Sequence, residues 1–459
     1  MKIFFILLTM TVTIHAAHFK DKKDGISGHI KLIHVLHGKD NGFDPETGST
    51  VGFNMKYRTK SFNGLHANIG FHYVGDTSLT NFDKGKNGKY DEKIASGLFL
   101  TPNFSSKSVL DEANIIYRLN DSIRIKFGRR HPSETLPSYI SNPIAMFKIS
   151  QVENAYEALS IKAKVLNDTV ASASHITKMM LGSRASTDYA LIGEYTNTAG
   201  VAINPSKLKG DFVDIGDLAF TNVNSANTDG ITMLSFVNKS FPKTTIQLWN
   251  YYAYDIVNFL NIQVDKTITV GNLNTTLKFQ YLNENDIGDS LSGNVNASMY
   301  GIMALFKLNP FIFSVAYNQS NGEFFNPWGF DSGFTSSMYS RNEYRDDVNA
   351  YKLGVKYSFI KNFKLSTSYA NYGQSNSYGG NVNRTLYPSR DAIEVDTVLS
   401  YKANKRLTLK LLNVLRESEY DSGISDRKQN QWRFIAQYKF WFKAEYSLIE
   451  ACKLNILNA

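Results

Sequence analysis

The chain has 459 residues, a formal net charge of +9 and a single cysteine, Cys452. One cysteine excludes a disulfide framework, and basic residues that are scattered rather than gathered in a run argue against nucleic acid as a partner. Aromatic residues make up 13% of the chain, which is high for a soluble protein. After the first residues, no apolar run is long enough to cross a bilayer as a helix.

The chain begins with a segment typical of a secretory signal peptide. Met1 and Lys2 form a short basic region, residues 3–14 are apolar, and Ala16 and Ala17 provide small residues for cleavage. We predict that residues 1–17 are a signal peptide, with an uncleaved anchor as the alternative. The folded domain is then expected over residues 18–440.

Segments in which apolar and polar side chains alternate recur through the rest of the chain. We place them near residues 26–36, 51–58, 65–73, 113–119, 123–128, 159–164, 170–179, 231–238, 244–254, 258–266, 277–281, 300–306, 311–317, 351–357, 363–369, 393–401, 407–411 and 432–440. Where the strands are clear, short connections such as 61–64 alternate with long ones such as 76–107. A soluble β-sandwich or propeller, the alternative, gives no reason for that alternation.

The pattern predicts an all-β fold, a transmembrane antiparallel β-barrel of about eighteen strands. Such barrels have short periplasmic turns, long external loops, an apolar face toward lipid and a polar face toward the lumen. The connection between the strands at 123–128 and 159–164 is long enough to fold into the lumen as a constriction loop. We expect Pro132–Pro143 to lie inside the barrel, and the constriction residues are predicted to be Arg130, Glu134, Ser138, Tyr139 and Asn142.

Sorting each strand by alternation puts many cations on the lumen face and none among the assigned lipid-facing positions. The predicted pore-lining basic residues are Lys56, Arg58, Arg118, Arg124, Lys126, Lys162, Lys164, Lys352, Lys356, Lys410 and Arg433. Inward acids are fewer: Glu112, Glu394 and Asp396. Many of the cations should share one arc of the wall, where their field would attract carboxylates or phosphates. The alternative is that they only keep the lumen hydrated.

Several stretches resemble the outer-membrane porin D (OprD-type) family of substrate-specific porins of Gram-negative bacteria. They are IRIKFGRRHPSETLPSYISNP (123–143), NAYEALSIKAKVLNDTVASASHITKM (154–179), TIQLWNYYAYDIVNFLNIQ (245–263) and YRDDVNAYKLGVKYSF (344–359). The resemblance implies an eighteen-stranded barrel, monomeric or loosely trimeric. It also implies an eyelet made by the third and seventh external loops, here residues 130–151 and 322–349, and a basic ladder that passes carboxylate-bearing solutes.

The end of the chain departs from that family. QWRFIAQYKF (431–440) resembles the terminal aromatic strand that the barrel assembly machinery reads, but residues 441–459 continue beyond it. This extension is expected to be a periplasmic helix, a frameshift product or a lineage-specific addition.

The sequence predicts a non-enzymatic channel without a cofactor. No GxSxG, HExxH or phosphate-loop motif stands out. His29, His66 and His72 share lumen parity, but without a neighbouring acidic or cysteine cluster we interpret them as wall residues and predict no metal. We expect a bacterial outer-membrane protein in contact with lipid, the barrel assembly machinery and small anionic or zwitterionic solutes. A non-specific porin and a structural or adhesive barrel are the alternatives.

Overall fold

The computed structural model describes residues 24–38, 46–79, 98–101, 105–131, 151–166, 168–183, 195–196, 202–203, 210–219, 228–322, 324, 333–338, 347–358, 360–374, 389–420 and 426–442. The predicted signal peptide and most of the predicted extension lie outside these residues. Among the described residues, no helix is both long and apolar enough to cross a membrane.

Eighteen long strands form the wall of the fold. They are β1 (Gly25–His37), β2 (Glu46–Arg58), β3 (Leu65–Asp76), β4 (Lys107–Arg118), β5 (Ile123–Arg130), β6 (Ala155–Leu166), β7 (Thr169–Met180), β11 (Ile231–Asn238), β12 (Thr244–Ala253), β13 (Val257–Val270), β14 (Leu273–Asp286), β15 (Asn296–Leu308), β16 (Phe311–Asn321), β17 (Asn349–Tyr357), β18 (Phe363–Asn371), β19 (Ser389–Lys402), β20 (Leu407–Tyr420) and β21 (Arg427–Phe442). The last strand includes Trp441 and Phe442, two residues beyond the expected end of the barrel.

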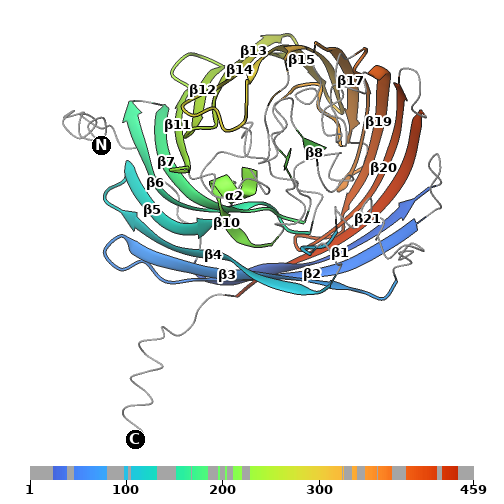
Figure 1. The fold of residues 1–459 in the computed structure, drawn as a ribbon. Coiled ribbons are helices and arrows are strands. Elements are labelled where there is room, and N and C mark those ends of the chain that lie inside the picture. The colour runs from blue at the N-terminus through green and yellow to red at the C-terminus, as the bar shows by residue number, and fades with distance from the viewer. Residues whose placement is uncertain are drawn as a thin grey trace, which may run out of the picture.

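The strands pair antiparallel in chain order and close on themselves. β7 pairs with β11, and β21 pairs with β1 over twelve residues from Ile26 to His37. Closure removes the unpaired edges that an open sheet would present. Figure 1 shows the resulting ring of strands, coloured from blue to red around its circumference, with blue and red meeting at the seam. The predicted antiparallel barrel of about eighteen strands is confirmed.

The two faces of the wall differ as the alternation predicts. On β3, the apolar side chains of Leu65 and Ile69 are exposed on the outside, and the alternate residues His66, Asn68 and His72 are buried on the inside. Large exposed apolar side chains recur at alternate positions on other strands, such as β15 and β17. An apolar exterior and a polar interior are the arrangement of barrels that span membranes.

The connections also alternate in length. Short turns follow β2, β4 and β6, whereas long connections follow β3, β5 and β16. The connection from β7 to β11 holds β8 (Tyr195–Thr196), β9 (Ala202–Ile203), β10 (Phe212–Asp214) and the short helix α2 (Ile215–Ala219). Ile215 belongs to the same buried apolar cluster as Trp249 and Met233 on the inner wall. This insertion therefore fills part of the barrel interior, where Figure 1 shows α2.

Candidate functional site

Nine of the eleven predicted pore-lining cations lie on neighbouring strands. We call them, together with Lys31 of β1, the basic arc. It consists of Lys31, Lys56, Arg58, Arg118, Arg124, Lys126, Lys162, Lys164, Lys410 and Arg433 on β1, β2, β4, β5, β6, β20 and β21. These strands adjoin because β21 pairs with β1, and β3 lies between β2 and β4. The other two, Lys352 and Lys356, are on β17.

Three cations of the basic arc stand directly opposite one another across three strands. Arg118 of β4 is the register partner of Arg124 of β5, and Arg124 is the partner of Lys162 of β6. Partners in an antiparallel pair have Cβ atoms about 5 Å apart, so like charges in these positions repel. Ser172 of β7 continues the row on its far side.

Other members of the basic arc have polar neighbours on the same face. Lys56 forms an ion pair with Glu112 across β3, where the intervening residue is Gly70 and no side chain separates them. The guanidinium of Arg58 contacts the ring of His66. Lys126 is buried, and its backbone oxygen accepts a hydrogen bond of 3.2 Å from Nη1 of Arg130.

The seam contributes cations from both ends of the chain. Val35 of β1 is the partner of Arg433, which in turn is the partner of Leu412 on β20. Lys31 and Arg416 are buried charged side chains in this region that the sequence assignment did not include. Both occupy lumen positions in the alternation of their strands, so sorting the predicted segment 26–36 and extending the sorting to the end of β20 would have found them.

Lys352 holds a segment of the predicted seventh loop against the wall. Its Nζ donates to the backbone oxygen of Ser336 at 2.5 Å and lies 3.2 Å from Oγ of Ser337. Asp396 accepts a hydrogen bond of 3.0 Å from the backbone nitrogen of Met338. The segment 333–338 therefore lies inside the barrel, in contact with β17 and β19. Lys356, nearer the turn, is exposed.

The same segment has two further anchors, both at Thr335. Its backbone nitrogen donates to Oδ1 of Asn318 at 2.8 Å, and its carbonyl oxygen accepts from the hydroxyl of Tyr372 at 2.9 Å. Asn318, Thr335 and Tyr372 are fully buried. Four wall residues thus fix this short stretch of backbone.

The predicted constriction loop is described only at its two ends. Glu134, Ser138, Tyr139, Asn142 and the stretch 132–143 lie outside the described residues, whereas Arg130 is buried at the end of β5. At the other end, the side-chain nitrogen of Gln151 donates to the backbone oxygens of Lys31 at 3.1 Å and Thr50 at 3.0 Å. A Cβ on Gly52 would meet Oε1 of Gln151 at 2.3 Å, so a glycine is needed there for this contact. The chain thus returns to β6 after touching the wall at β1 and β2.

A third inward segment was not predicted. Leu98 and Phe99, from the connection between β3 and β4, are fully buried. They pack with Ile33 of β1, Ile435 of β21 and Met338 of the segment 333–338. This stretch has no helical or strand pattern of apolar residues, so nothing in it indicated an inward position.

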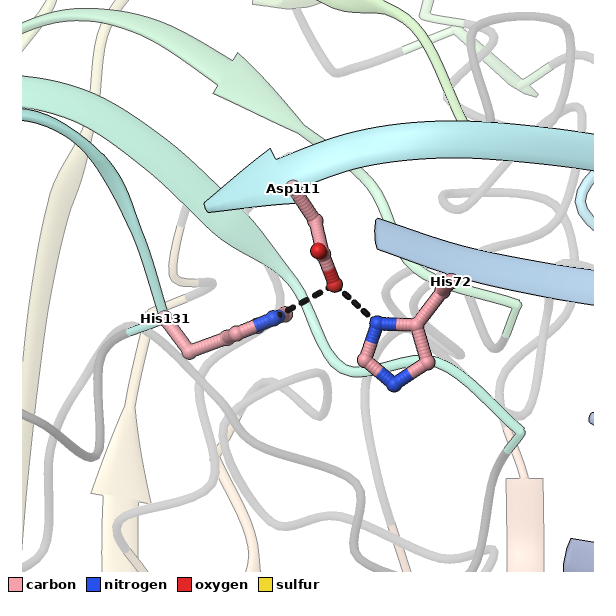
Figure 2. Close-up of side chains that lie close together, drawn as sticks. All are labelled: His72, Asp111 and His131. Atoms are coloured by element: carbon pink, nitrogen blue, oxygen red, sulfur yellow. Dashed lines mark hydrogen bonds and ion pairs between the residues drawn. The ribbon is translucent and has the colours of Figure 1, made fainter. Parts of the chain in front are cut away.

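His72, Asp111 and His131 meet on the inner wall beside the root of the constriction loop. Nδ1 of His72 and Nε2 of His131 both contact the same carboxylate oxygen of Asp111, the latter at 2.8 Å. Figure 2 shows the two rings directed at this carboxylate, one from β3 and the other from the end of β5. All three side chains are buried. Of the three predicted lumen histidines, only His72 belongs to this cluster.

A β-bulge places Asp111 in the lumen. Gly70 is the partner of Glu112, but His72 is the partner of Val109, so β4 has one residue more than β3 in this interval. As a result, Asp111 and Glu112 are consecutive and both buried. Strict alternation from the predicted inward Glu112 assigns Asp111 to the outer face, which is why the sequence did not reveal the cluster.

The carboxylate of Asp111 favours the protonated form of His131. Burial opposes protonation of its imidazole, but the charge and hydrogen bond of Asp111 outweigh burial and raise the pKa of His131 to about 9. Its other nitrogen, Nδ1, donates to the backbone oxygen of Asn154 at 2.9 Å. The ring therefore links the wall to both ends of the constriction loop.

A closed eighteen-stranded barrel with an apolar exterior and inward-folded segments is the architecture of the porin class of membrane channels. Solved structures of membrane channels are similar to this chain. OccAB4 of Acinetobacter baumannii is similar to the chain with 14% identity, over 92% of this chain and 99% of that chain, and a TM-score of 0.69. OpdK of Pseudomonas aeruginosa with vanillate has 10% identity, 93% and 100% coverage and a TM-score of 0.66. OccK2 (OpdF) of the same organism, in complex with glucuronate, is 12% identical over 91% of this chain and 98% of that chain, with a TM-score of 0.63.

These similarities concern the fold. The chain has the fold of the Occ channels over nearly their full length, which is the fold that the resemblance to OprD-type porins implied. No protein-family model and no curated protein sequence matches the chain.

Proposed function

We propose that the protein is an outer-membrane channel through which small carboxylate-bearing solutes diffuse. The observation that carries the proposal is the row of Arg118, Arg124 and Lys162, partners across three strands on the lumen face. These three side chains place positive charge along one stretch of the lumen face. Such a stretch attracts a solute that carries negative charge.

The magnitudes favour anion selectivity. At an effective dielectric constant near 20, two unit charges about 4 Å apart interact by about 4 kcal/mol. Salt and water weaken this interaction, but a wall that presents several cations on one arc still focuses a positive field into the channel. A carboxylate is then favoured over a cation along this arc.

The structural neighbours support the same solute class. OpdK is described with vanillate and OccK2 with glucuronate, both of which are carboxylates. OpdK is also described as an outer membrane protein. We extend this location to the chain, together with export by a cleaved signal peptide, insertion by the barrel assembly machinery and a non-enzymatic role.

Solute uptake into liposomes tests the proposal. Full-length protein in liposomes should admit small carboxylates faster than amines or neutral sugars of the same size, and its reversal potential in a salt gradient should indicate anion preference. Equal uptake of all three solute classes, with a large unsaturable conductance, would identify a non-specific porin. Absence of any solute-dependent current would identify a structural or adhesive barrel.

A further inference from the structure

The cluster of His72, Asp111 and His131 has the composition of a metal site. It offers two imidazole nitrogens and one carboxylate oxygen, and these three atoms lie within 4.8 Å of one another. A tetrahedral ion with ligands at about 2.0–2.1 Å needs its ligand atoms roughly 3.3 Å apart. The separations of at most 4.8 Å exceed that spacing by about 1.5 Å at most, so binding requires a small adjustment of the ligand atoms.

The hydrogen bonds around the cluster orient its atoms for a metal. Nδ1 of His131 donates to the backbone oxygen of Asn154 at 2.9 Å, which directs Nε2 at Asp111. A metal-binding histidine is commonly held through its second nitrogen in this way, because the backbone oxygen fixes both the tautomer and the ring orientation.

The carboxylate of Asp111 can accept a further ligand contact. Oδ2 of Asp111 contacts both histidines, whereas Oδ1 is buried and has no hydrogen-bond partner among the described residues. A buried carboxylate oxygen without a partner is costly, and a cation bound between the carboxylate and the two rings would remove that cost. The ring of His29 lies 5.6 Å from the ring of His72, so a third imidazole borders the site.

We propose that His72, Asp111 and His131 bind a divalent transition-metal ion in the barrel lumen. Two imidazoles and one carboxylate suit Zn²⁺ and its first-row neighbours, whereas Ca²⁺ and Mg²⁺ prefer oxygen ligands throughout. Three protein ligands leave a fourth position for water or for an anion in the lumen.

The ion would join the constriction loop to the wall. His72 and Asp111 are on β3 and β4, whereas His131 begins the loop that follows β5. A bound ion therefore cross-links the root of this loop to two wall strands. Metal binding itself does not require the proposed channel function, so the two proposals can fail independently.

Calorimetric titration of Zn²⁺ into untagged full-length protein in detergent tests the site, since a histidine tag would bind zinc itself. The expected result is one ion per chain in the micromolar range or tighter. Asp111→Asn and His131→Gln should each weaken binding at least about tenfold. The matched control is His175→Gln, because His175 is on β7 and contacts Thr232 rather than the cluster; this variant should bind as the wild type does.

Co²⁺ provides a readout that a structural role would not produce. In the wild type, bound Co²⁺ should give the visible absorption bands of a four-coordinate site, and Asp111→Asn should lose them while keeping the heat-modifiable migration of a folded barrel. If Asp111→Asn does not fold, the wild-type stoichiometry and Co²⁺ bands decide the matter. The proposal would be overturned if the wild type showed no saturable Zn²⁺ binding, or if His175→Gln lost as much Zn²⁺ affinity as Asp111→Asn. The cluster would then be a set of hydrogen bonds that holds His131 against the wall.

Discussion

The wall carries charged side chains into the lumen on two arcs, and it uses them differently. On β4 to β6, Arg118, Arg124 and Lys162 stand opposite one another. On β17 and β19, Lys352 and Asp396 bind the backbone of the segment 333–338. On β4 to β6, the first arc, three cations of the basic arc stand in a row. On β17 and β19, the second arc, one cation and one acid bind an uncharged stretch of backbone.

The difference shows that lumen parity does not by itself assign a role to a charged residue. Lys352 and Arg124 were predicted by the same alternation, yet the ammonium of Lys352 is engaged by Ser336 and Ser337. Charges on the second arc position a segment that lies inside the barrel. We therefore expect substitutions on the first arc to change selectivity, and substitutions on the second to change channel width and stability.

Both arcs face the lumen only if the opposite face of the barrel lies in lipid. The largest loss of stability should therefore come from a charge placed on that outer face. Ile302 on β15 is 53% exposed at an outward position, and the next residue, Met303, has lumen parity. Ile302→Arg should destabilise the barrel by about 2–4 kcal/mol, the cost of a cation near the bilayer midplane. Urea unfolding in lipid vesicles measures this. Met303→Arg is the control and should cost much less; equal costs would mean that the two faces are not in different solvents.

Removing charge from the first arc should alter selectivity and leave the fold intact. Arg124→Gln with Lys162→Gln should reduce carboxylate uptake about tenfold, which corresponds to about 1.4 kcal/mol, and shift the reversal potential away from anions. The control is Lys60→Gln with Lys361→Gln, which removes two charges from exposed turns. If both double variants keep the wild-type anion preference, the basic arc only hydrates the wall.

A smaller effect is expected on the second arc from loss of one hydroxyl. Tyr372→Phe removes the hydrogen bond to the buried carbonyl of Thr335 and should destabilise the barrel by about 1 kcal/mol. Because the segment 333–338 loses an anchor, single-channel current should also become larger or noisier. Tyr317→Phe is the matched control, since its hydroxyl donates to Asn349 in an exposed position. A change of equal size in both variants would contradict a specific role for Tyr372.

The strand pattern was readable because lipid and lumen impose opposite requirements on successive residues. The segment predicted at 231–238 coincides with β11, and the segments predicted at 300–306 and 311–317 lie within β15 and β16. The alternation of apolar and polar residues weakens where a strand extends beyond the apolar outer band of the barrel. Alternation on β20 was followed only to Leu411, but the strand continues to Tyr420, and Glu417 and Glu419 there are exposed on the outer side. Arg416 was missed for this reason.

The candidate sites were less accessible to sequence reasoning than the wall. Asp111 reaches the lumen through a bulge that changes the parity of β4, and alternation alone cannot register an extra residue. Gln151 and His131 contact the wall because of the path that a long connection takes, which depends on contacts distant in sequence. The lumen positions proposed for the basic residues of β5 and β6 need only strand parity, so a sequence alone is enough to predict them.

The seam between β1 and β21 passes through the basic arc. Lys31 is contributed by the first strand and Arg433 by the last, so the cations of this region come from opposite ends of the chain. This pairing has the greatest separation in sequence of any in the sheet, and loop-closure entropy rises slowly with that separation. A chain that lacks its last strand would expose an unpaired edge at the same place and hold only part of the cationic surface. The proposed anion selectivity would therefore be incomplete in a barrel that lacks its last strand.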